Sequence, residues 1–191
     1  MNSLAYALLS MLVRKPCSGY ELKHLLEVFW QAKHSQIYPL LTKLQQDSLL
    51  TYELVEQSGK PNKKIYSITD KGLAVLQEWI SCKSALPVIR DEFLIKVYAI
   101  WLVDTQSAKR MFEERISLFR KQVNYRLNEI RGMEEEHRNG IPDISSRSFG
   151  RYILFQRKLR QEQEEIEWCE WVLALLEENQ DSRLEEVKRN T

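Results

Sequence analysis

The 191-residue sequence contains little of what marks several large classes of protein. Its three cysteines, at positions 17, 82 and 169, form no CxxC pair, so a disulfide framework is not expected. Six glycines and five prolines are too few for a low-complexity chain. No apolar run reaches the roughly 18 residues that a membrane span needs. These absences favour a globular protein of the reducing cytoplasm, with no membrane partner.

Patterns that would carry catalysis or bind a metal are also missing. The three histidines, His24, His34 and His137, share no metal-ligand spacing with one another or with a cysteine. The sequence has no G-x-S-x-G, P-loop or G-x-G-x-x-G motif. The acidic runs at 134–136 and 162–167 lie in predicted helices, where a solvated face explains them. We therefore expect neither enzymatic activity nor a cofactor or metal.

The apolar amino terminus, MNSLAYALLSMLVRK, predicts a helix over 3–14. The apolar residues on one side of this helix are Leu4, Leu8, Met11 and Leu12, and Ser3 is the candidate N-cap. No basic residue precedes this run and no small-residue cleavage site follows it, so a signal peptide is not expected. Residues 15–19 predict a turn, and a second helix is predicted from Tyr20 to Phe29.

The next segment predicts a third helix, a β-hairpin and a fourth helix. The third helix covers about 34–47 and contains Pro39, which must lie near the first turn unless the helix bends there. Alternating residues after Asp47 predict a strand, residues 58–62 predict a turn, and residues 64–68 predict the returning strand. Thr69 or Asp70 is expected to cap a helix that runs to about Cys82. This order is that of a winged helix-turn-helix.

A winged helix places its third helix in the DNA major groove and its hairpin tip near phosphates. In this sequence the apolar side of that helix would be Ile37, Leu40, Leu41 and Leu44. The candidate DNA-contacting residues are Lys33, His34, Ser35, Gln36, Tyr38, Thr42 and Lys43 in the helix, with Lys60, Asn62, Lys63 and Lys64 at the wing. Gln36 suits an adenine edge, whereas the lysines suit phosphates. Tyr38 is either a contact or a packing residue.

The second half of the chain predicts only helices. Helices are expected at 90–103 and 105–137, with a stop at Asn139-Gly140-Ile141-Pro142, and a last helix from Ser145 or Ser146 to about Glu178 or beyond. Residues 152, 159, 166 and 173 follow seven-residue steps, and 155, 162, 169 and 176 form a companion row, as in a coiled coil. Such a seam normally buries against another helix, so a homodimer is expected. The candidate interface residues are Phe112, Phe119, Tyr152, Phe155, Leu159, Ile166, Leu173 and Leu176.

Charge separates the two halves, although the whole chain carries only +1. Residues 1–85 contain ten Lys and Arg against seven Asp and Glu, a net of +3, whereas residues 86–191 contain eighteen against twenty, a net of −2. The fold predicted is mainly α with a small β-hairpin. It comprises a winged helix-turn-helix DNA-binding domain at 1–85 and an all-α dimerisation domain with long antiparallel helices at 86–191. The modest positive excess fits phosphate contact by the first domain.

Three ordered motifs resemble the PadR family of transcriptional regulators. They are Ser18-Gly19-Tyr20-Glu21-Leu22, then Ile37-Tyr38-Pro39-Leu40-Leu41-Thr42-Lys43-Leu44, then the wing from Gly59 to Thr69 with Gly72. The tail is similar to the longer-tailed branch that includes the virulence activator AphA, in segments such as Arg90-Asp91-Glu92-Phe93. One departure occurs at Asp47-Ser48-Leu49, where the family normally has glycine after an acidic residue.

The resemblance implies a homodimeric DNA-binding regulator that acts on a palindromic operator. It also implies that a small hydrophobic or aromatic effector can act on such a protein, as phenolic acids do on some relatives. Trp30 and Trp101 are candidate effector contacts, with core or dimer packing as the other interpretation. Tyr20 and Tyr66 are expected to pack, and Cys169 is expected to be a small buried hydrophobe.

Two other classes of function remain open at this point. In the first, the winged helix no longer binds DNA and the protein is an interaction adaptor. In the second, it is a small-molecule-binding accessory protein of an enzyme. Binding to DNA in the presence of competitor separates the regulator from both.

Overall fold

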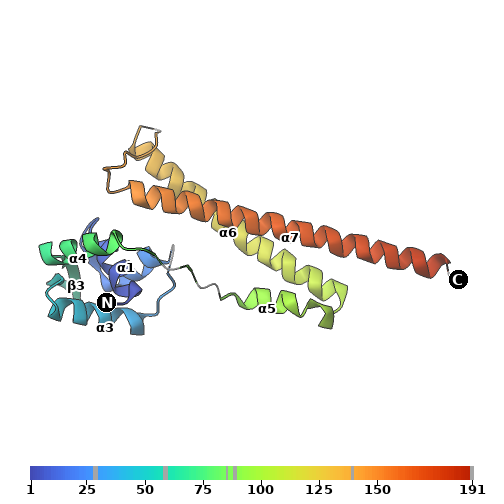
Figure 1. Cartoon of the computed structure of the whole chain (residues 1–191), viewed down its shortest axis with the longest axis horizontal. Helices are drawn as coiled ribbons and strands as arrows, with labels where there is room; N and C mark the ends of the chain where they lie inside the picture. The colour runs from blue at the N-terminus through green and yellow to red at the C-terminus, as the bar shows by residue number, and fades with distance from the viewer. Residues whose placement is uncertain (28–29, 58–59, 85, 88–89, 139, 190–191) are drawn as a thin grey trace. The chain divides into compact units, whose positions relative to one another are not determined.

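The computed structural model describes residues 1–27, 30–57, 60–84, 86–87, 90–138 and 140–189, without the side chains of residues 57, 60–61 and 179–189. The chain divides into two compact units, Met1–Leu86 and Pro87–Thr191, coloured blue to green and green to red (Figure 1). The sequence predicted the boundary one residue earlier. None of the helices in the described ranges combines the length and hydropathy needed to cross a membrane.

The amino-terminal unit is a winged helix-turn-helix. Its described helices and strands are α1 (Ser3–Leu12), β1 (Cys17–Ser18), α2 (Gly19–Leu26), α3 (His34–Gln46), β2 (Leu50–Gln57), β3 (Lys60–Ile68) and α4 (Asp70–Ile80). The strands form one antiparallel sheet in the order β1-β3-β2. Three helices followed by a hairpin confirm the predicted fold.

Strand β1 is a feature that the sequence did not predict. Residues 15–19 were expected to form a plain turn, but Cys17 lies opposite Tyr66 and Ser18 opposite Ile65 in a short ladder with β3. Two residues are too few to show alternation, so no sequence pattern marks such a strand. The predicted hairpin turn at 58–62 is also too long, because β3 already begins at Lys60. Residues 58–59 lie outside the described part.

The ends of the helices follow capping chemistry. Asn2, and not Ser3, caps α1, and its Oδ1 accepts a hydrogen bond of 2.9 Å from the Ala5 N–H. Thr69 caps α4 by accepting from the Gly72 N–H, and α4 ends at Ile80, two residues before the predicted end. Such side-chain oxygens satisfy N–H groups that have no partner inside the helix.

The core of this unit fixes which side of α3 faces outward. The fully buried side chains include Leu8 and Leu9 of α1, Leu22 and Leu26 of α2, and Ile37, Leu41 and Leu44 of α3. Because the three buried residues of α3 lie at helical spacing on one side, the opposite side is left to solvent. Leu40, predicted to be buried with them, is only partly buried.

The turn after α3 contains a strained residue where the family pattern has glycine. Ser48 has a φ of 59°, in the left-handed region that favours glycine. The first turn of α4 packs on this turn, since the Thr69 hydroxyl donates to the Ser48 carbonyl at 2.8 Å. A Cβ at Gly72 would lie 2.1 Å from the Leu49 carbonyl oxygen, so only glycine fits there. Close packing against the Leu49 backbone therefore explains the glycine that the family motif has at position 72.

Replacing Ser48 by glycine is expected to raise the free energy of unfolding by about 0.5–1 kcal/mol. The left-handed conformation costs a non-glycine residue about 1–2 kcal/mol, and the greater freedom of glycine in the unfolded chain offsets part of that gain. Urea denaturation followed by circular dichroism measures the change. Ser81→Gly is the matched control, because Ser81 has a φ of −78° and should gain nothing. A lower stability for Ser48→Gly would show that the backbone there is not strained.

The second unit, called the helical unit below, comprises α5 (Glu92–Tyr98), the 3-10 helix η1 (Ile100–Leu102), α6 (Thr105–Glu136) and α7 (Phe149–Arg189). The single helix predicted at 90–103 is thus broken, because the Ala99 backbone (φ −102°, ψ 19°) leaves the helical region. Helix α6 matches its prediction to within one residue.

The connection between the two long helices differs from its prediction in two places. The left-handed residue after α6 is Arg138, with a φ of 57°, and not the glycine at 140. Helix α7 begins at Phe149 and not at Ser145 or Ser146, because Asp143 accepts hydrogen bonds from both the N–H and the hydroxyl of Ser145 in a local turn. Asn139 lies outside the described residues.

Helices α6 and α7 lie side by side along most of α6 (Figure 1). The heptad residues of α7 face α6 of the same chain: Tyr152, Phe155, Leu159 and Cys169 are buried, and Ile166, Leu173 and Leu176 are partly buried. Phe112 is fully buried beside Cys169, whereas Phe119 is partly buried. Cys169 is fully buried, which confirms the prediction of a small buried hydrophobe, and burial raises the pKa of its thiol to about 11.

Helix α5 is attached to the long helices through Arg115 of α6. The Arg115 guanidinium lies 2.6 Å from Asp91 and 2.8 Å from Glu165, with its centre 4.2 Å from the centre of the Phe93 ring. The guanidinium holds the pKa of the Asp91 carboxyl below its ordinary value. Because Asp91 also caps α5, one ion-pair network fixes where α5 begins.

Candidate nucleic-acid interface

The outward side of α3 carries the side chains predicted to contact DNA. Those from the helix and its cap, Lys33, His34, Ser35, Gln36, Tyr38, Thr42 and Lys43, are all exposed. They lie opposite the buried side formed by Ile37, Leu41 and Leu44. An α-helix with one apolar side docked and one polar side free has the shape and chemistry to enter the major groove.

Gln36 already makes a hydrogen bond in the structure. Its Oε1 accepts from the Lys33 N–H at 3.0 Å, which closes the first turn of α3. Reading an adenine requires the amide oxygen and the amide nitrogen together. Gln36 must therefore share or release its bond to Lys33 in order to read a base, whereas Ser35 makes no such bond within the described residues.

Three aromatic rings join α3 to the start of α2, and we name them the aromatic shelf: Tyr20, His34 and Tyr38. The rings of Tyr20 and His34 are stacked with centres 6.2 Å apart, and those of His34 and Tyr38 with centres 5.9 Å apart. Tyr20 is 60% exposed and Tyr38 is 46% exposed. The shelf extends the outward side of α3 across to α2.

Gly19 determines where the Tyr38 ring can lie. A Cβ at Gly19 would be 2.7 Å from a carbon of that ring, so the ring packs against the start of α2 only because position 19 has no side chain. Tyr38 thus both packs on α2 and stays exposed. Tyr66 is buried as predicted, but the packing role predicted for Tyr20 is wrong, because its ring lies on the surface.

The first turn of α2 links the shelf to the wing. Ser18 and Glu21 form a capping box in which Glu21 accepts from both the Ser18 N–H (2.8 Å) and its hydroxyl (2.6 Å). These hydrogen bonds, together with Lys63 at 3.4 Å, lower the pKa of Glu21 to about 2. Glu21 therefore stays ionised and holds Lys63 of β3 beside α2.

The wing lysines do not form one cluster. Adjacent residues of a strand point to opposite sides. Lys63 accordingly reaches Glu21, while the Lys64 ammonium lies 4.1 Å from the centre of the Tyr52 ring. Asn62 is exposed at the same end of β3, and the side chain of Lys60 lies outside the described part. The two lysine side chains therefore leave β3 in different directions.

Sequence reasoning missed three residues of this surface: Gly19, Tyr20 and Glu21. All three belong to the motif that begins at Ser18, which the sequence marked as a family resemblance and as the turn and start of a helix, but not as part of a binding surface. Their role depends on Tyr38, His34 and Lys63, which are distant in sequence. Tyr20 in the first turn of a short amphipathic helix was the one available signal, since an aromatic there need not face the core.

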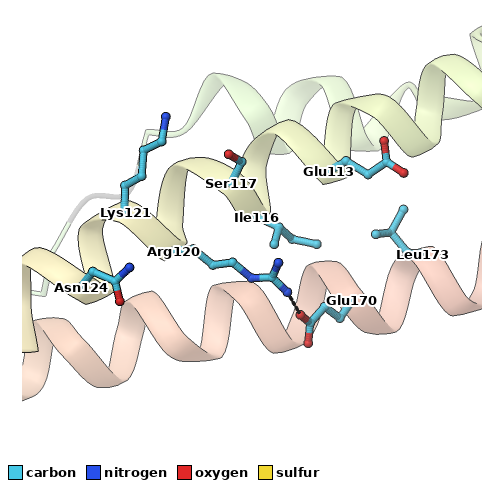
Figure 2. Close-up of a pocket in the computed structure, with 8 residues that line it drawn as sticks. All are labelled: Glu113, Ile116, Ser117, Arg120, Lys121, Asn124, Glu170 and Leu173. Carbon is cyan, nitrogen blue, oxygen red and sulfur yellow. Dashed lines mark hydrogen bonds and ion pairs between the residues drawn. The ribbon is translucent and has the colours of Figure 1, made fainter.

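Surface hollows of different size occur in the described part of the chain. One of about 440 Å³ lies between α6 and α7, where Figure 2 shows Arg120 pointing at Glu170, 2.8 Å away. Another of about 280 Å³ lies between α1 and α3, and a third of about 750 Å³ lies along α5. Neither Trp30 nor Trp101 lines these hollows, and both are exposed, which excludes core packing for them. No group of metal-ligating side chains occurs among the described residues.

Comparison with known proteins gives a family match for each of the two units. A family model described as "Transcriptional regulator PadR-like family" matches residues 8–78, and one described as "Virulence activator alpha C-term" matches residues 89–177. The negative transcriptional regulator PadR of Bacillus subtilis is 32% identical over 186 residues, covering 94% of this chain and all of that protein.

Solved structures agree with the sequence comparison. The crystal structure of Bacillus subtilis PadR in complex with operator DNA matches with a TM-score of 0.78 at 30% identity, covering 92% of this chain and 98% of that chain. The same protein in complex with p-coumaric acid matches with a TM-score of 0.68 at 30% identity, covering 92% and 99%. The Vibrio cholerae virulence activator AphA matches with a TM-score of 0.63 at 26% identity, covering 92% and 98%. The winged fold and the helical tail are therefore shared with these proteins.

Proposed function

Because the chain belongs to the PadR-like family of transcriptional regulators, we propose that it regulates transcription by binding operator DNA as a homodimer. Its relatives are regulators rather than enzymes, as the lack of a catalytic pattern led us to expect. The observation that carries the proposal is one continuous surface: the outward side of α3, the aromatic shelf, and Lys63 of β3 joined to α2 through Glu21. The complex of Bacillus subtilis PadR with operator DNA supports it.

The residues of this surface take different roles in the proposal. Lys33, Lys43, Lys60, Lys63 and Lys64 contact phosphates and supply affinity and salt dependence. Ser35 and Gln36, near the start of α3, read base edges, with Thr42 toward its other end. Tyr38, His34 and Asn62 lie against the sugar-phosphate backbone.

The experiment that tests this proposal measures binding to duplex DNA from upstream of the protein's own gene. We expect binding by fluorescence anisotropy that survives competitor DNA, with an affinity that falls steeply as salt rises, by a slope of about −0.9 for each phosphate neutralised. Protected half-sites should be related by two-fold symmetry and lie about one helical turn apart. Failure to bind any fragment at low salt would favour the adaptor instead.

Dimerisation is proposed through the helical unit. Several apolar side chains of α5, η1 and the residue after it are exposed within one chain: Leu94, Ile95, Tyr98, Trp101, Leu102 and Val103. An apolar surface of this kind is typical of an interface. The heptad residues Tyr152, Phe155 and Leu159 act in this proposal by building the α6–α7 hairpin, and Phe112 supports it from α6. Four other side chains are only partly buried within one chain, so part of each can contact a partner chain: Phe119, Ile166, Leu173 and Leu176.

Sedimentation velocity tests the dimer and locates its interface. The wild-type protein is expected to sediment as a dimer at micromolar concentration. Ile95→Asp, at a residue 71% exposed, should shift it toward monomer with unchanged helix content, because a charge enters the interface without entering a core. Ile166→Asp, in contrast, should also lower stability, since Ile166 packs around Phe112 in its own chain. A wild-type monomer would contradict the proposal.

A small aromatic effector is a further part of the proposal. It is supported by the complex of Bacillus subtilis PadR with p-coumaric acid. An effector that favours one arrangement of the two units would change the spacing of the two α3 helices in the dimer, and so change DNA affinity. Trp101, 78% exposed, and Trp30, 40% exposed, remain the candidate contacts.

A further inference from the structure

The three histidines of the chain have different surroundings. His137 Nε2 lies 2.8 Å from the Ser148 hydroxyl in the helical unit. His24 Nδ1 lies 3.5 Å from a carboxylate oxygen of Glu27. His34 lies on the aromatic shelf between Tyr20 and Tyr38, and no other described residue makes a hydrogen bond or an ion pair with its ring. Of the three, His34 alone is exposed on the proposed DNA surface with both ring nitrogens available within the described part of the chain.

The groups around His34 give a protonated ring no partner among the described residues of the free protein. The carboxylates of α2 and its carboxyl-terminal cap already have partners: Glu21 lies 3.4 Å from Lys63, and Glu27 lies 2.9 Å from Lys23. The uncharged rings of Tyr20 and Tyr38 are stacked with His34, and the His24 ring lies edge-on to Tyr20 with 4.6 Å between ring centres. The residue before His34 is Lys33.

His34 also lies at the end of α3 that attracts an anion. It is the first residue of the helix, where the aligned peptide dipoles carry partial positive charge. Lys33, the residue before it, adds a positive charge at the same end of the helix. A DNA phosphate beside the start of α3 would be attracted by the helix terminus, by Lys33 and by an imidazolium at His34.

We propose that His34 binds DNA in its protonated form, so that the affinity of the protein for its operator rises as the pH falls from 8 to 6. This inference rests on the proposed function. Histidine is the side chain whose charge ordinarily changes in that range. If the complex holds a proton that the free protein lacks, lower pH favours the complex, and raising the pH through this range releases the proton and weakens binding. A dimer takes up at most two protons in this way.

Two measurements on the full-length protein test the proposal. Anisotropy titrations on one operator duplex at pH 6.0 and pH 8.0 should show binding about tenfold tighter at pH 6.0. Salt titrations should give a slope at pH 6.0 that is steeper by about 0.9 for each His34 protonated. His34→Gln should remove both differences, whereas His34→Lys, with a permanent charge, should bind at pH 8.0 about as tightly as the wild type does at pH 6.0.

The other two histidines are the matched controls. His24→Gln should keep the pH dependence, because Glu27 already pairs with that ring in the free protein, and His137→Gln should keep it because that ring lies in the helical unit. Equal wild-type affinity at both pH values, or a pH dependence that His34→Gln leaves intact, overturns this inference and leaves the proposed function standing. Absence of DNA binding at every pH overturns both.

Discussion

Replacing Arg126 by alanine is expected to destabilise the helical unit by about 3–5 kcal/mol, whereas Arg120→Ala should change its stability by less than about 1 kcal/mol. Both arginines lie on α6 and both pair with a glutamate of α7. Arg126 Nη2 lies 2.9 Å from Glu162, and Arg120 Nη2 lies 2.8 Å from Glu170. The chain thus contains two ion pairs of similar geometry and very different burial.

Burial is the reason for the difference. Arg126 is 4% exposed and Glu162 is 1% exposed, in the middle of the apolar contact between α6 and α7. The Arg126 guanidinium also lies 4.8 Å from the centre of the Phe155 ring. Without the arginine, the Glu162 carboxylate is left in a dry environment with no counter-charge, which is costly. Arg120 and Glu170 are in water, which solvates either group alone.

Urea denaturation followed by the fluorescence of Trp168 and Trp171 in α7 reports on this unit. A double replacement, Arg126→Leu with Glu162→Leu, should restore most of the stability lost in Arg126→Ala, because no buried charge remains. If the double variant is as unstable as the single one, the loss comes from packing around Arg126 and not from an unpaired carboxylate. Equal losses for Arg126→Ala and Arg120→Ala would contradict the role of burial.

Exchanging both wing lysines, Lys63→Glu with Lys64→Glu, is expected to weaken operator binding by a factor of about 100 or more at low salt. Each lysine is proposed to neutralise one phosphate, so the slope of log affinity against log salt should become shallower by about 0.9 for each phosphate that is no longer neutralised in each subunit. The reversed charges add repulsion. Because the change acts on the DNA backbone, the weakening should be similar for operators that differ in base sequence.

Two controls separate this effect from damage to the fold. Lys121→Glu with Arg131→Glu makes the same change of charge on exposed residues of α6 and should leave operator affinity within about twofold at moderate salt. The Lys63→Glu replacement puts a second carboxylate beside Glu21, so the stability of the wing variant must be measured as well. Lys63→Gln with Lys64→Gln avoids that repulsion and should still make the salt slope shallower. An unchanged slope in both wing variants would exclude these lysines from the interface.

The helices of the chain were largely predictable from sequence. Helix α3 was predicted to within one residue and α6 likewise, because their apolar residues recur at 3.6-residue spacing and their ends carry breaking or capping residues. Predictions failed where local chemistry competes, as at the start of α7, where Asp143 and Ser145 form a turn instead of a helix. They also failed at β1, which exists only through its pairing with β3.

Part of the candidate site was also predictable from the periodicity of the sequence. The exposed lysines and the polar side of α3 follow from periodicity and motif. The aromatic shelf does not, since Tyr20 and His34 are fourteen positions apart and meet only when α2 packs on α3. Likewise, the opposite directions of Lys63 and Lys64 follow from strand geometry once β3 is known to begin at Lys60.

The sequence by itself determined the classes of protein excluded by its few cysteines and lack of catalytic patterns, the order of helices and strands, and which face of each helix is apolar. Only the tertiary structure decided what those faces contact. The heptad row of α7 suggested an interface between subunits, yet it packs on α6 of the same chain. Glu162, the polar residue in this row, forms an ion pair with Arg126 of α6. Hydrophobic periodicity specifies that a face is buried, and the burial free energy is the same whether the covering helix belongs to the same chain or to another. The identity of the partner helix is therefore a property of the folded chain.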